Sequence, residues 1–200
     1  MLIIDEILKL KRGVYALRFG ARQVMVSETQ LVQHHLYKGQ EIEEGLIKVL
    51  EKEFLNSQCL HKSIDIISRR NHFVKELRTK LLQKEFDREV IDDTIDRLID
   101  EGYMDELETA RQLVAVRSET DSKSKIKMRL IQRGCPENIV DLVLQDGTGD
   151  EFEKAMTAAR KKLRQLEGEP EDKQKEKLMR NLLSKGFDYG VVRRVWEELQ

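Results

Sequence analysis

The chain has 200 residues, of which 40% are hydrophobic and only 6% aromatic, which excludes a single large aromatic-rich core and favours small helical modules in one or two domains. Its 36 Lys and Arg residues nearly balance 37 Asp and Glu residues, so a net charge of −1 excludes bulk attraction to polyanions. Any anion binding must therefore come from uneven placement of charge along the chain.

The N-terminal residues 1–10 are apolar but do not resemble a targeting segment. Asp5 and Glu6 interrupt them and no small-residue cleavage site follows, so we expect no signal peptide. No run of about 18 apolar residues occurs, which predicts no membrane span and no membrane partner. Cys59 and Cys135 lie far apart without a C-x-x-C spacing, so neither a disulfide framework nor a zinc site is indicated. We expect a reducing cytoplasm as the location.

Three short β-rich stretches open the chain, at residues 2–4, 14–19 and 24–26. Gly13 lies before the second stretch and Gly20 lies between the second and the third, where turns are expected. This pattern predicts a small antiparallel sheet of two or three strands, which needs a helix to cover it.

Helical patterning replaces the strand pattern after residue 26. Ser27 predicts the N-cap of a helix that carries Leu36 and stops at Gly39. From Glu41 onward apolar residues return at helical spacing and continue to Leu199. We therefore expect everything after about residue 41 to be helical.

The strongest internal signal is a repeat that recurs three times, with turns at residues 84–87, 133–136 and 185–188, offset by 49 and 52 residues. With that register fixed, apolar residues coincide in the helix before each turn and in the helix after it. The coinciding sets are Leu77, Ile126 and Leu178; Leu81, Leu130 and Leu182; Leu82, Ile131 and Leu183; Val90, Ile139 and Val191; Ile91, Val140 and Val192; Thr94, Val143 and Val195; and Ile95, Leu144 and Trp196. One helix-turn-helix therefore recurs, and further amphipathic helices upstream, around residues 60–70, 106–117 and 151–166, complete a three-helix unit of about 50 residues.

The turn itself has a local explanation in the sequence. Gly134 and Gly186 stand where a helix ends in a left-handed residue, and Glu85 takes that place in the first unit at some steric cost. Asp87 and Asp188 are predicted to cap the helices that follow.

These patterns predict a mainly α fold of three tandem three-helix, helix-turn-helix-like repeats in an elongated array, preceded by a small N-terminal β-hairpin or sheet plus helix. The predicted divisions are a β-containing domain at 1–48 and repeats at 49–104, 105–147 and 148–200. The best candidate for a hinge is Gln145–Asp150.

Catalytic and metal-binding patterns are missing from the sequence. It contains no phosphate-binding glycine loop, no G-x-S-x-G, no H-E-x-x-H and no Cys–His pair at a recognisable spacing. His34 and His35 point to different faces of a helix, and Asp92, Asp96 and Asp100 fit a solvated acidic face better than an ion site. We expect no enzyme activity, no metal and no cofactor.

Charge is strongly segregated between neighbouring segments. Residues 85–108 hold eleven acidic and two basic residues, whereas residues 109–135 hold seven basic and two acidic ones. A basic residue also recurs before each turn, as Lys84, Arg133 and Lys185. Each basic run could be a solubilising helix face, but such surfaces also suit a phosphate backbone. The candidate residues for binding a nucleic acid or a similar polyanion are Arg78, Lys80, Lys84, Arg117, Lys123, Lys125, Lys127, Arg129, Arg133, Arg160, Lys161, Lys162, Arg164, Arg193 and Arg194.

Aromatic residues that could stack on bases are few. Phe86, Phe187 and Trp196 fall at core positions of the repeat, which leaves other aromatic residues as candidates for stacking. These are Phe73, Tyr103 and Tyr189. Recognition of a specific duplex sequence is therefore disfavoured.

Several segments together resemble a known family. They are Leu77–Asp87 (LRTKLLQKEFD), Val90–Leu98 (VIDDTIDRL), Gly102–Asp105 (GYMD), the closing Lys185–Trp196, and, near the start, Val14–Leu17 and Val26–Glu41. In order and spacing they are similar to the RecX regulators of the RecA recombinase, over nearly the whole chain. The chain departs from the family pattern at Glu85, at Cys135–Pro136 and at Glu106–Glu108.

The resemblance implies a protein of tandem three-helix units that lies along the groove of a RecA filament on single-stranded DNA. We expect weak, sequence-independent affinity for the strand, and we expect a monomer, although no residue pattern determines the oligomeric state. Such a protein binds and limits the recombinase, ATPase and co-protease activities of RecA without catalysis of its own.

Two other classes stay open on the residues alone. A helical adaptor that binds another protein without nucleic acid fits the near-zero net charge equally well and predicts no affinity for single strands at any salt concentration. An enzyme is the third class, and assays for ATP hydrolysis or nuclease activity in the isolated protein would detect it.

Overall fold

The computed structural model describes residues 1–145 and 150–199. The chain forms two compact units, one made of Met1–Arg70 and Leu77–Glu101 and the other of Asn71–Glu76 and Gly102–Gln200. None of the helices in the described ranges is long and apolar enough to cross a membrane. The predicted hinge at Gln145–Asp150 falls mainly on residues 146–149, which lie outside the described residues.

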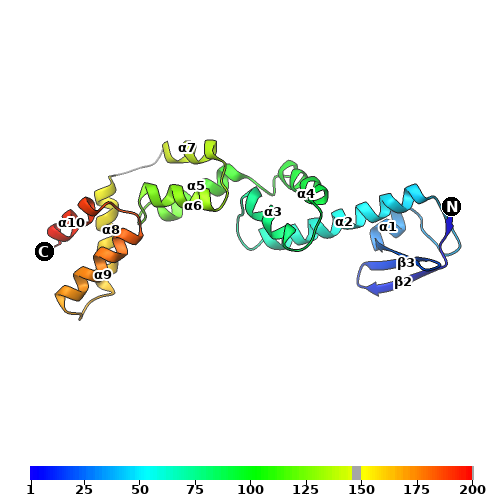
Figure 1. The fold of residues 1–200 in the computed structure, drawn as a ribbon, viewed down its shortest axis with the longest axis horizontal. Helices are drawn as coiled ribbons and strands as arrows, with labels where there is room; N and C mark the ends of the chain where they lie inside the picture. The colour runs from blue at the N-terminus through cyan, green and yellow to red at the C-terminus, as the bar shows by residue number, and fades with distance from the viewer. Residues whose placement is uncertain (146–149, 200) are drawn as a thin grey trace. The chain divides into compact units, whose positions relative to one another are not determined.

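The elements confirm the predicted fold class, a mainly helical chain behind a small N-terminal sheet (Figure 1). The strands are β1 (Leu2–Ile3), β2 (Glu6–Lys11), β3 (Val14–Phe19), β4 (Arg22–Ser27) and β5 (Glu41–Ile42). The helices are α1 (Glu28–Gln33), α2 (Glu44–Ile67), α3 (Val74–Leu82), α4 (Arg88–Asp100), α5 (Glu106–Arg117), α6 (Lys123–Gln132), α7 (Glu137–Gln145), α8 (Glu151–Arg164), α9 (Glu171–Ser184) and α10 (Tyr189–Glu198).

The N-terminal sheet has a different membership from the predicted one. The central strand β3 pairs antiparallel with β2 on one side and β4 on the other. Strand β2 was not predicted, and the predicted strand at residues 2–4 instead pairs with β5 in a separate two-stranded ladder. That pairing joins residues far apart in the sequence, such as Leu2 and Ile42, so no local pattern announces it.

The helix predicted after residue 27 begins as expected but ends early. Ser27 is its N-cap and forms a capping box with Gln30, in which Gln30 N donates to Ser27 Oγ at 3.1 Å and Ser27 N donates to Gln30 Oε1 at 2.9 Å. The helix ends at Gln33 because His35 adopts a left-handed φ of 49°, and Leu36 N then donates to Leu31 O at 2.9 Å. The prediction that this helix extends through Leu36 to Gly39 was wrong.

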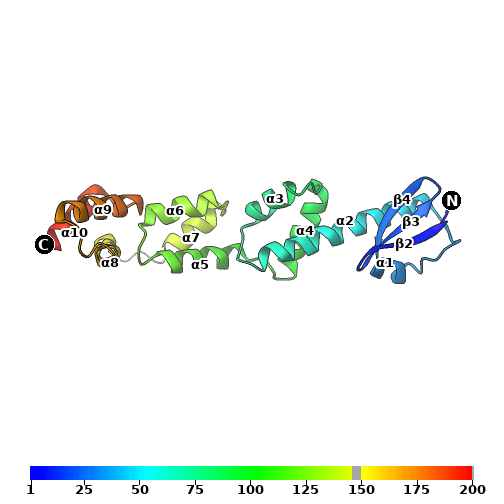
Figure 2. The same ribbon diagram turned by 90° about the horizontal axis from the view of Figure 1, so that it is seen from below.

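Helix α2 begins at Glu44, as the helical spacing from about residue 41 predicts, and it continues without a break through most of the repeat helix expected around residues 60–70. Its first half buries Ile47 and Leu50 in the core of the N-terminal sheet and packs on β4 (Figure 2). Its second half buries Cys59 and packs on α4. One helix thus serves two neighbours, and it runs through residues 48 and 49, where the sequence placed a division.

The predicted repeat register is confirmed at the core positions of α3, α6 and α9. The first two sets, at the Leu77 and Leu81 positions, are buried in all three sequence repeats. The third set is wrong as a core position, since Leu82, Ile131 and Leu183 are exposed on the helix surface. The second compact unit, made of Asn71–Glu76 and Gly102–Gln200, has two cores: one lies among α5, α6 and α7, and the other among α8, α9 and α10.

The turns agree with the sequence analysis except at one cap. Glu85, Gly134 and Gly186 all have positive φ angles, of 64°, 85° and 86°. Asp188 accepts a hydrogen bond from Gly190 N at 2.7 Å, as predicted. Asp87 stands at the N-cap of α4 but its side chain makes no capping hydrogen bond, so that prediction was wrong.

Candidate polyanion interface

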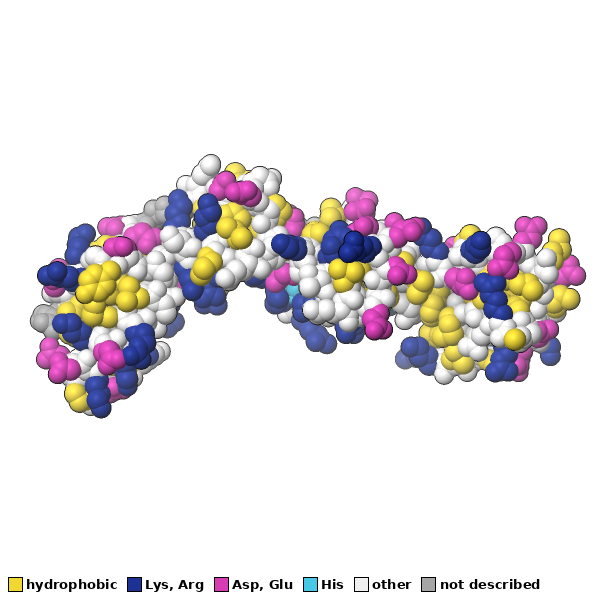
Figure 3. Space-filling model, viewed as in Figure 1, with side chains coloured by type: hydrophobic (Ala, Val, Ile, Leu, Met, Phe, Trp, Pro, Cys, Tyr) yellow, Lys and Arg dark blue, Asp and Glu magenta, His cyan; other side chains and the backbone are white. Residues whose placement is uncertain are grey.

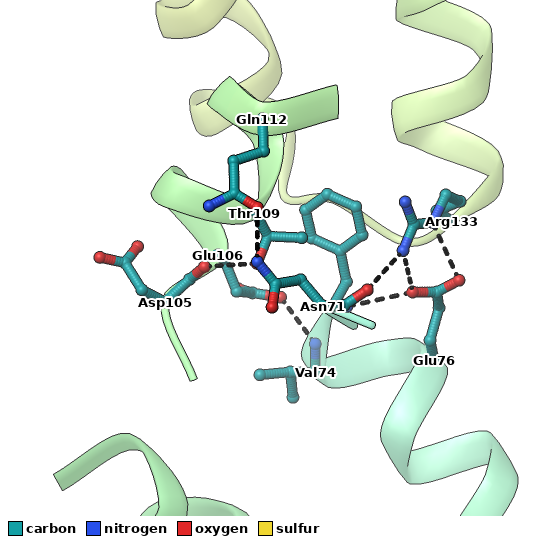
Figure 4. Close-up of polar contacts among 9 residues, drawn as sticks. Asn71, Val74, Glu76, Asp105, Glu106, Thr109, Gln112 and Arg133 are labelled. Carbon is teal, nitrogen blue, oxygen red and sulfur yellow. Dashed lines mark hydrogen bonds and ion pairs between the residues drawn. The ribbon is translucent and has the colours of Figure 1, made fainter. Parts of the chain in front are cut away.

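The turn after α6 holds Arg133 against the segment Asn71–Glu76 (Figure 4). Nε of Arg133 donates to Glu76 Oε1 at 3.0 Å, and one terminal nitrogen donates to Glu76 Oε2 and to Asn71 O, both at 2.9 Å. The guanidinium also lies 5.2 Å from the ring centroid of the fully buried Phe73. This planar fork fits its partners closely, so Arg133 acts here as a structural clamp.

The same segment is held at two further points. Val74 N donates to Glu106 Oε1 at 2.9 Å, and Asn71 Nδ2 donates to Gln112 Oε1 at 2.7 Å (Figure 4). Because Phe73 is buried in the core of α5, α6 and α7, it is removed from the candidates for base stacking. Tyr103 and Tyr189 are exposed.

The turn after α9 forms a second clamp at the equivalent position of the repeat. Lys185 Nζ donates to Oδ1 of the buried Asp121 at 3.2 Å, and Ser122 N donates to Lys185 O at 3.1 Å. Nε of Arg129 lies 3.3 Å from Oδ2 of the same carboxylate, an ion-pair contact without hydrogen-bond alignment. Asp121 is thus shared by two cations.

Close backbone approach accompanies both clamps. A Cβ atom on Gly134 would lie 2.6 Å from Lys75 Cβ, and one on Gly186 would lie 2.6 Å from Ser122 Oγ. Only glycine leaves room for this packing and also favours the left-handed backbone. Lys84, the equivalent basic residue of the first turn, has no side-chain hydrogen bond or ion pair within the described part of the chain.

Several other predicted site residues have partners of their own. Arg78 pairs with Asp92, Lys127 Nζ lies 3.7 Å from an Asp141 oxygen, Arg193 Nε donates to Glu197 at 2.8 Å, Lys162 Nζ donates to Gln165 at 3.3 Å, and Arg194 lies 4.8 Å from the ring centroid of Phe152. The predicted residues whose side chains make no hydrogen bond, ion pair or cation–π contact with any described residue are Lys80, Lys84, Arg117, Lys123, Lys125, Arg160, Lys161 and Arg164.

Three predicted basic residues come together at one cavity of about 220 Å³, which we call the cationic hollow. Arg117 at the end of α5 faces Lys161 and Lys162 of α8 across it, and Lys185 joins them from the end of α9. The described residues that line the hollow include no carboxylate; the others are Thr120, Ala158, Gln165 and Asn181. Such a set offers positive charge and neutral hydrogen-bond donors, the chemistry that binds phosphate oxygens.

The first unit has a more open hollow of about 390 Å³ beside its own turn. Lys62 of α2 and Lys84 supply its positive charge, while Glu85 lies beside them and the half-buried Phe86 provides an apolar wall. Gln58 and Gln83 complete the lining. The mixed charge makes this hollow a weaker anion site than the cationic hollow.

No single-sign patch dominates the face of the two units that Figure 3 shows, where Lys and Arg side chains are interspersed with Asp and Glu. Within residues 1–145 and 150–199, no three His, Cys, Asp or Glu side chains are grouped so as to hold a metal ion.

Comparisons of the sequence and of the fold with known proteins both identify one family. Residues 59–98 match the family model of the first three-helix domain of RecX, and residues 149–196 match that of the third. The regulatory protein RecX of Chlorobium limicola is 32% identical over 133 residues, which cover 66% of this chain and 82% of that protein. The chain belongs to the RecX family.

Two further RecX relatives show how the lengths compare. The regulatory protein RecX of Chlorobium phaeobacteroides is 34% identical over 139 residues, 68% of this chain and 90% of that protein. That of Oceanobacillus iheyensis is 29% identical over 177 residues, 87% of this chain but 65% of that protein. The chain therefore matches less than two thirds of the Oceanobacillus protein.

Solved RecX structures have the same fold. A crystal structure of regulatory protein RecX superimposes with a TM-score of 0.64 at 22% identity, covering 98% of this chain and 100% of that one. RecX from Lactobacillus salivarius superimposes with a TM-score of 0.54 at 23% identity, covering 72% of this chain and 96% of that one.

Sequence reasoning found part of the cationic hollow of this RecX chain and missed the rest. Arg117, Lys161 and Lys162 were predicted, whereas Lys185 was noted only as a recurring residue and Asn181 not at all. The spacing of Ala158, Lys161, Lys162 and Gln165 on α8 is the available signal, because residues three and four apart share a helix face. Arg160 and Arg164 were predicted but do not line the hollow.

Proposed function

We propose that this RecX-family chain binds the RecA filament on single-stranded DNA and restrains the recombinase, ATPase and co-protease activities of RecA. It acts by binding and not by catalysis. Membership of a family whose relatives are named regulatory proteins supports regulation. The cationic hollow, with four basic side chains and no lining carboxylate among the described residues, is the observation that favours contact with a phosphate backbone.

The contact residues that we propose are the basic side chains that the fold leaves without partners, together with Lys162 at the hollow. In the second unit, Arg117 and Lys161 lie at the hollow itself, and Lys123, Arg160 and Arg164 are exposed outside it. Each cation that neutralises a phosphate releases a counterion, so binding should weaken as salt rises.

The mechanism that follows is steric and electrostatic. A helical array that occupies the filament blocks the entry of a duplex or of a repressor substrate, and one that bridges protomers changes how filament ends grow or dissociate. Several weak contacts along one filament add through their high effective concentration, so a modest affinity at each site is sufficient. One chain can then affect more than one RecA protomer.

The first experiment is the rate of ATP hydrolysis by RecA on single-stranded DNA as this chain is added, at two salt concentrations. We expect suppression at fewer chains than RecA protomers, and less suppression at the higher salt. The test variant replaces Arg117, Lys161 and Lys162 with Glu. A matched control replaces Lys11, Arg12 and Lys38 with Glu, which changes the charge equally at exposed residues of the first unit that have no partner in the described structure.

The test variant should lose at least tenfold in potency while the control keeps the activity of the parent chain. Equal loss of potency in both variants would mean that the net charge of the chain, and not the cationic hollow, determines suppression of RecA. No suppression by the parent chain, together with no binding to a bare single strand, contradicts the proposal and favours the helical adaptor.

A further inference from the structure

The cationic hollow lies at the joint between the two three-helix groups of the second unit. Arg117 and Thr120 belong to the α5 end of the first group, whereas Lys161, Gln165 and Asn181 belong to α8 and α9 of the second. Three polar contacts join the two groups. Lys185 Nζ donates to Asp121 Oδ1, Ser122 N donates to Lys185 O, and Lys123 N donates to Glu151 Oε1 at 2.9 Å.

Like charges face each other across this joint. Arg117 from one side and Lys161 from the other have no ion-pair partner in the described chain, and Lys162 is bound only to the neutral Gln165. The carboxylate of Asp121, which contacts Lys185, is also in contact with Arg129. Without an anion, repulsion between these cations opposes the contacts that close the joint.

The helix ends explain why the cations nevertheless stand there. Arg117 is the last residue of α5 and Lys185 is the C-cap of α9. Both positions carry the partial negative charge of a helix C-terminus, which stabilises a cation in the last turn. The fold therefore places positive charge at the joint and leaves a space of about 220 Å³ between the charges. Since one water takes about 30 Å³ in the liquid, the space holds a phosphate group with some of its waters.

We propose that the cationic hollow binds a phosphate group and that the bound phosphate ties the α5–α7 group to the α8–α10 group. The basic side chains neutralise its charge, and Thr120, Gln165 and Asn181 offer neutral hydrogen-bond donors. Two sources share this chemistry: free inorganic phosphate and a phosphate of a nucleic-acid backbone. For the second source the inference rests on the proposed function, and for the first it stands alone.

The test uses the full chain and its single tryptophan, Trp196, which lies in α10 of the second unit and packs on its core. Thermal unfolding is followed by Trp196 fluorescence in sodium phosphate and in sodium chloride of equal ionic strength. We expect a rise of about 5 °C at phosphate ten times its dissociation constant. The phosphorus resonance of inorganic phosphate should broaden when the chain is added.

The variant that isolates the hollow is Arg117→Gln with Lys161→Gln, which removes one unpartnered cation from each side of the joint. We expect it to unfold in chloride at the same temperature as the parent or higher, because repulsion is relieved, and to lose the phosphate-specific rise. The matched control, Lys11→Gln with Arg12→Gln, should keep the full rise. Because phosphate also stabilises proteins nonspecifically, an equal rise in all three proteins overturns the proposal, as does an equal rise in phosphate and chloride.

A further arm identifies the source of the phosphate. An oligothymidylate that raises the Trp196 transition in the parent but not in the Arg117→Gln, Lys161→Gln variant identifies the strand backbone as the source. A shift with inorganic phosphate alone identifies a small-anion site. Neither result depends on RecA. If phosphate raises the unfolding temperature of a chain that does not suppress RecA, the proposed function is refuted, while the assignment of the hollow as a phosphate site stands.

Discussion

At the scale of single residues, Arg133 shows how a basic side chain can serve the fold. Its position before a turn recurs in the sequence and suggested a surface contact, yet its guanidinium is bound to Glu76, to Asn71 O and to the Phe73 ring. Lys cannot present the same planar fork, so the identity of the cation matters here.

We expect Arg133→Ala to lower the free energy of unfolding of the second unit by about 2 kcal/mol, because charge-assisted hydrogen bonds are lost at a mostly buried carboxylate. Arg133→Lys should recover less than half of that loss. Urea unfolding followed by Trp196 fluorescence measures both. Equal stabilities for the Lys variant and the parent would show that charge alone is sufficient.

Cys135 gives a prediction about pH. Burial raises the pKa of its thiol to about 11, and the nearby charge of Glu106 adds to the shift. Since the thiol stays protonated in the folded chain, its alkylation by iodoacetamide at pH 8 should be about a hundredfold slower in the native protein than in urea. Mass spectrometry of the Cys135 peptide measures the two rates.

The same shift has a consequence for stability. The folded pKa lies above the unfolded one, so the stabilising contribution is complete below about pH 9 and is lost as the pH rises toward 11, at up to about 1.4 kcal/mol per pH unit. Cys135→Ala should flatten that part of the pH profile. A native thiol that reacts as fast as the unfolded one would contradict both expectations.

At the scale of elements, the three turns have one backbone shape and different neighbours. Gly134 and Gly186 are pressed against side chains that a Cβ atom would overlap. Glu85 holds the same left-handed backbone with a φ of 64°, and it is exposed. The first turn thus tolerates a side chain because it lacks that close packing, and it accepts the backbone strain.

We expect opposite effects from two substitutions in these turns. Gly186→Ala should destabilise the second unit by more than about 1 kcal/mol, since the new Cβ would lie 2.6 Å from Ser122 Oγ in a backbone that already disfavours it. Glu85→Gly should stabilise the first unit by up to about 1 kcal/mol by relieving the left-handed strain. Urea unfolding checks both, by Trp196 fluorescence for the second unit and by circular dichroism for the first. Loss of stability in Glu85→Gly would mean that the carboxylate has a structural role.

The elements also show what local sequence can predict. The apolar spacing that buries Ile126 and Leu130 sets the helices and their register, because it repeats every turn of one face. The pairing of Leu2 with Ile42 could not be found this way, because it joins segments far apart in the sequence. Helical spacing does predict a helix from about residue 41, but no side-chain N-cap marks its start at Glu44.

The candidate site was predictable to a similar extent. Basic runs identified Arg117, Lys161 and Lys162, but their meeting at one hollow depends on the fold bringing the end of α5 near α8 and the end of α9, which no spacing encodes. Sequence alone likewise could not separate free cations from those, such as Arg129, that bind a buried carboxylate. Reversing the charge of Arg129 would therefore disturb the fold and test binding poorly.

At the scale of the whole molecule, the chain has two compact units with separate cores. Leu17 lies in the core of the N-terminal sheet, and Leu182 in the core of α8, α9 and α10. Units with their own cores can unfold separately, and then a single free energy does not describe the chain. The position of the only tryptophan makes this testable, because Trp196 fluorescence reports the second unit while far-ultraviolet circular dichroism reports helices in both.

We expect Leu17→Ala to shift the circular dichroism transition and leave the Trp196 transition unchanged. Leu182→Ala should shift the Trp196 transition, together with the part of the circular dichroism change that comes from the helices of the second unit. Each substitution deletes most of a fully buried side chain and should cost about 2–5 kcal/mol in the unit that holds it. If Leu17→Ala moves both transitions equally, the units unfold as one, and an effect at the filament contacts of one unit would reach the other through the fold. Separate transitions would instead mean that the units bind as linked modules, whose joint affinity depends on the effective concentration of one near the other.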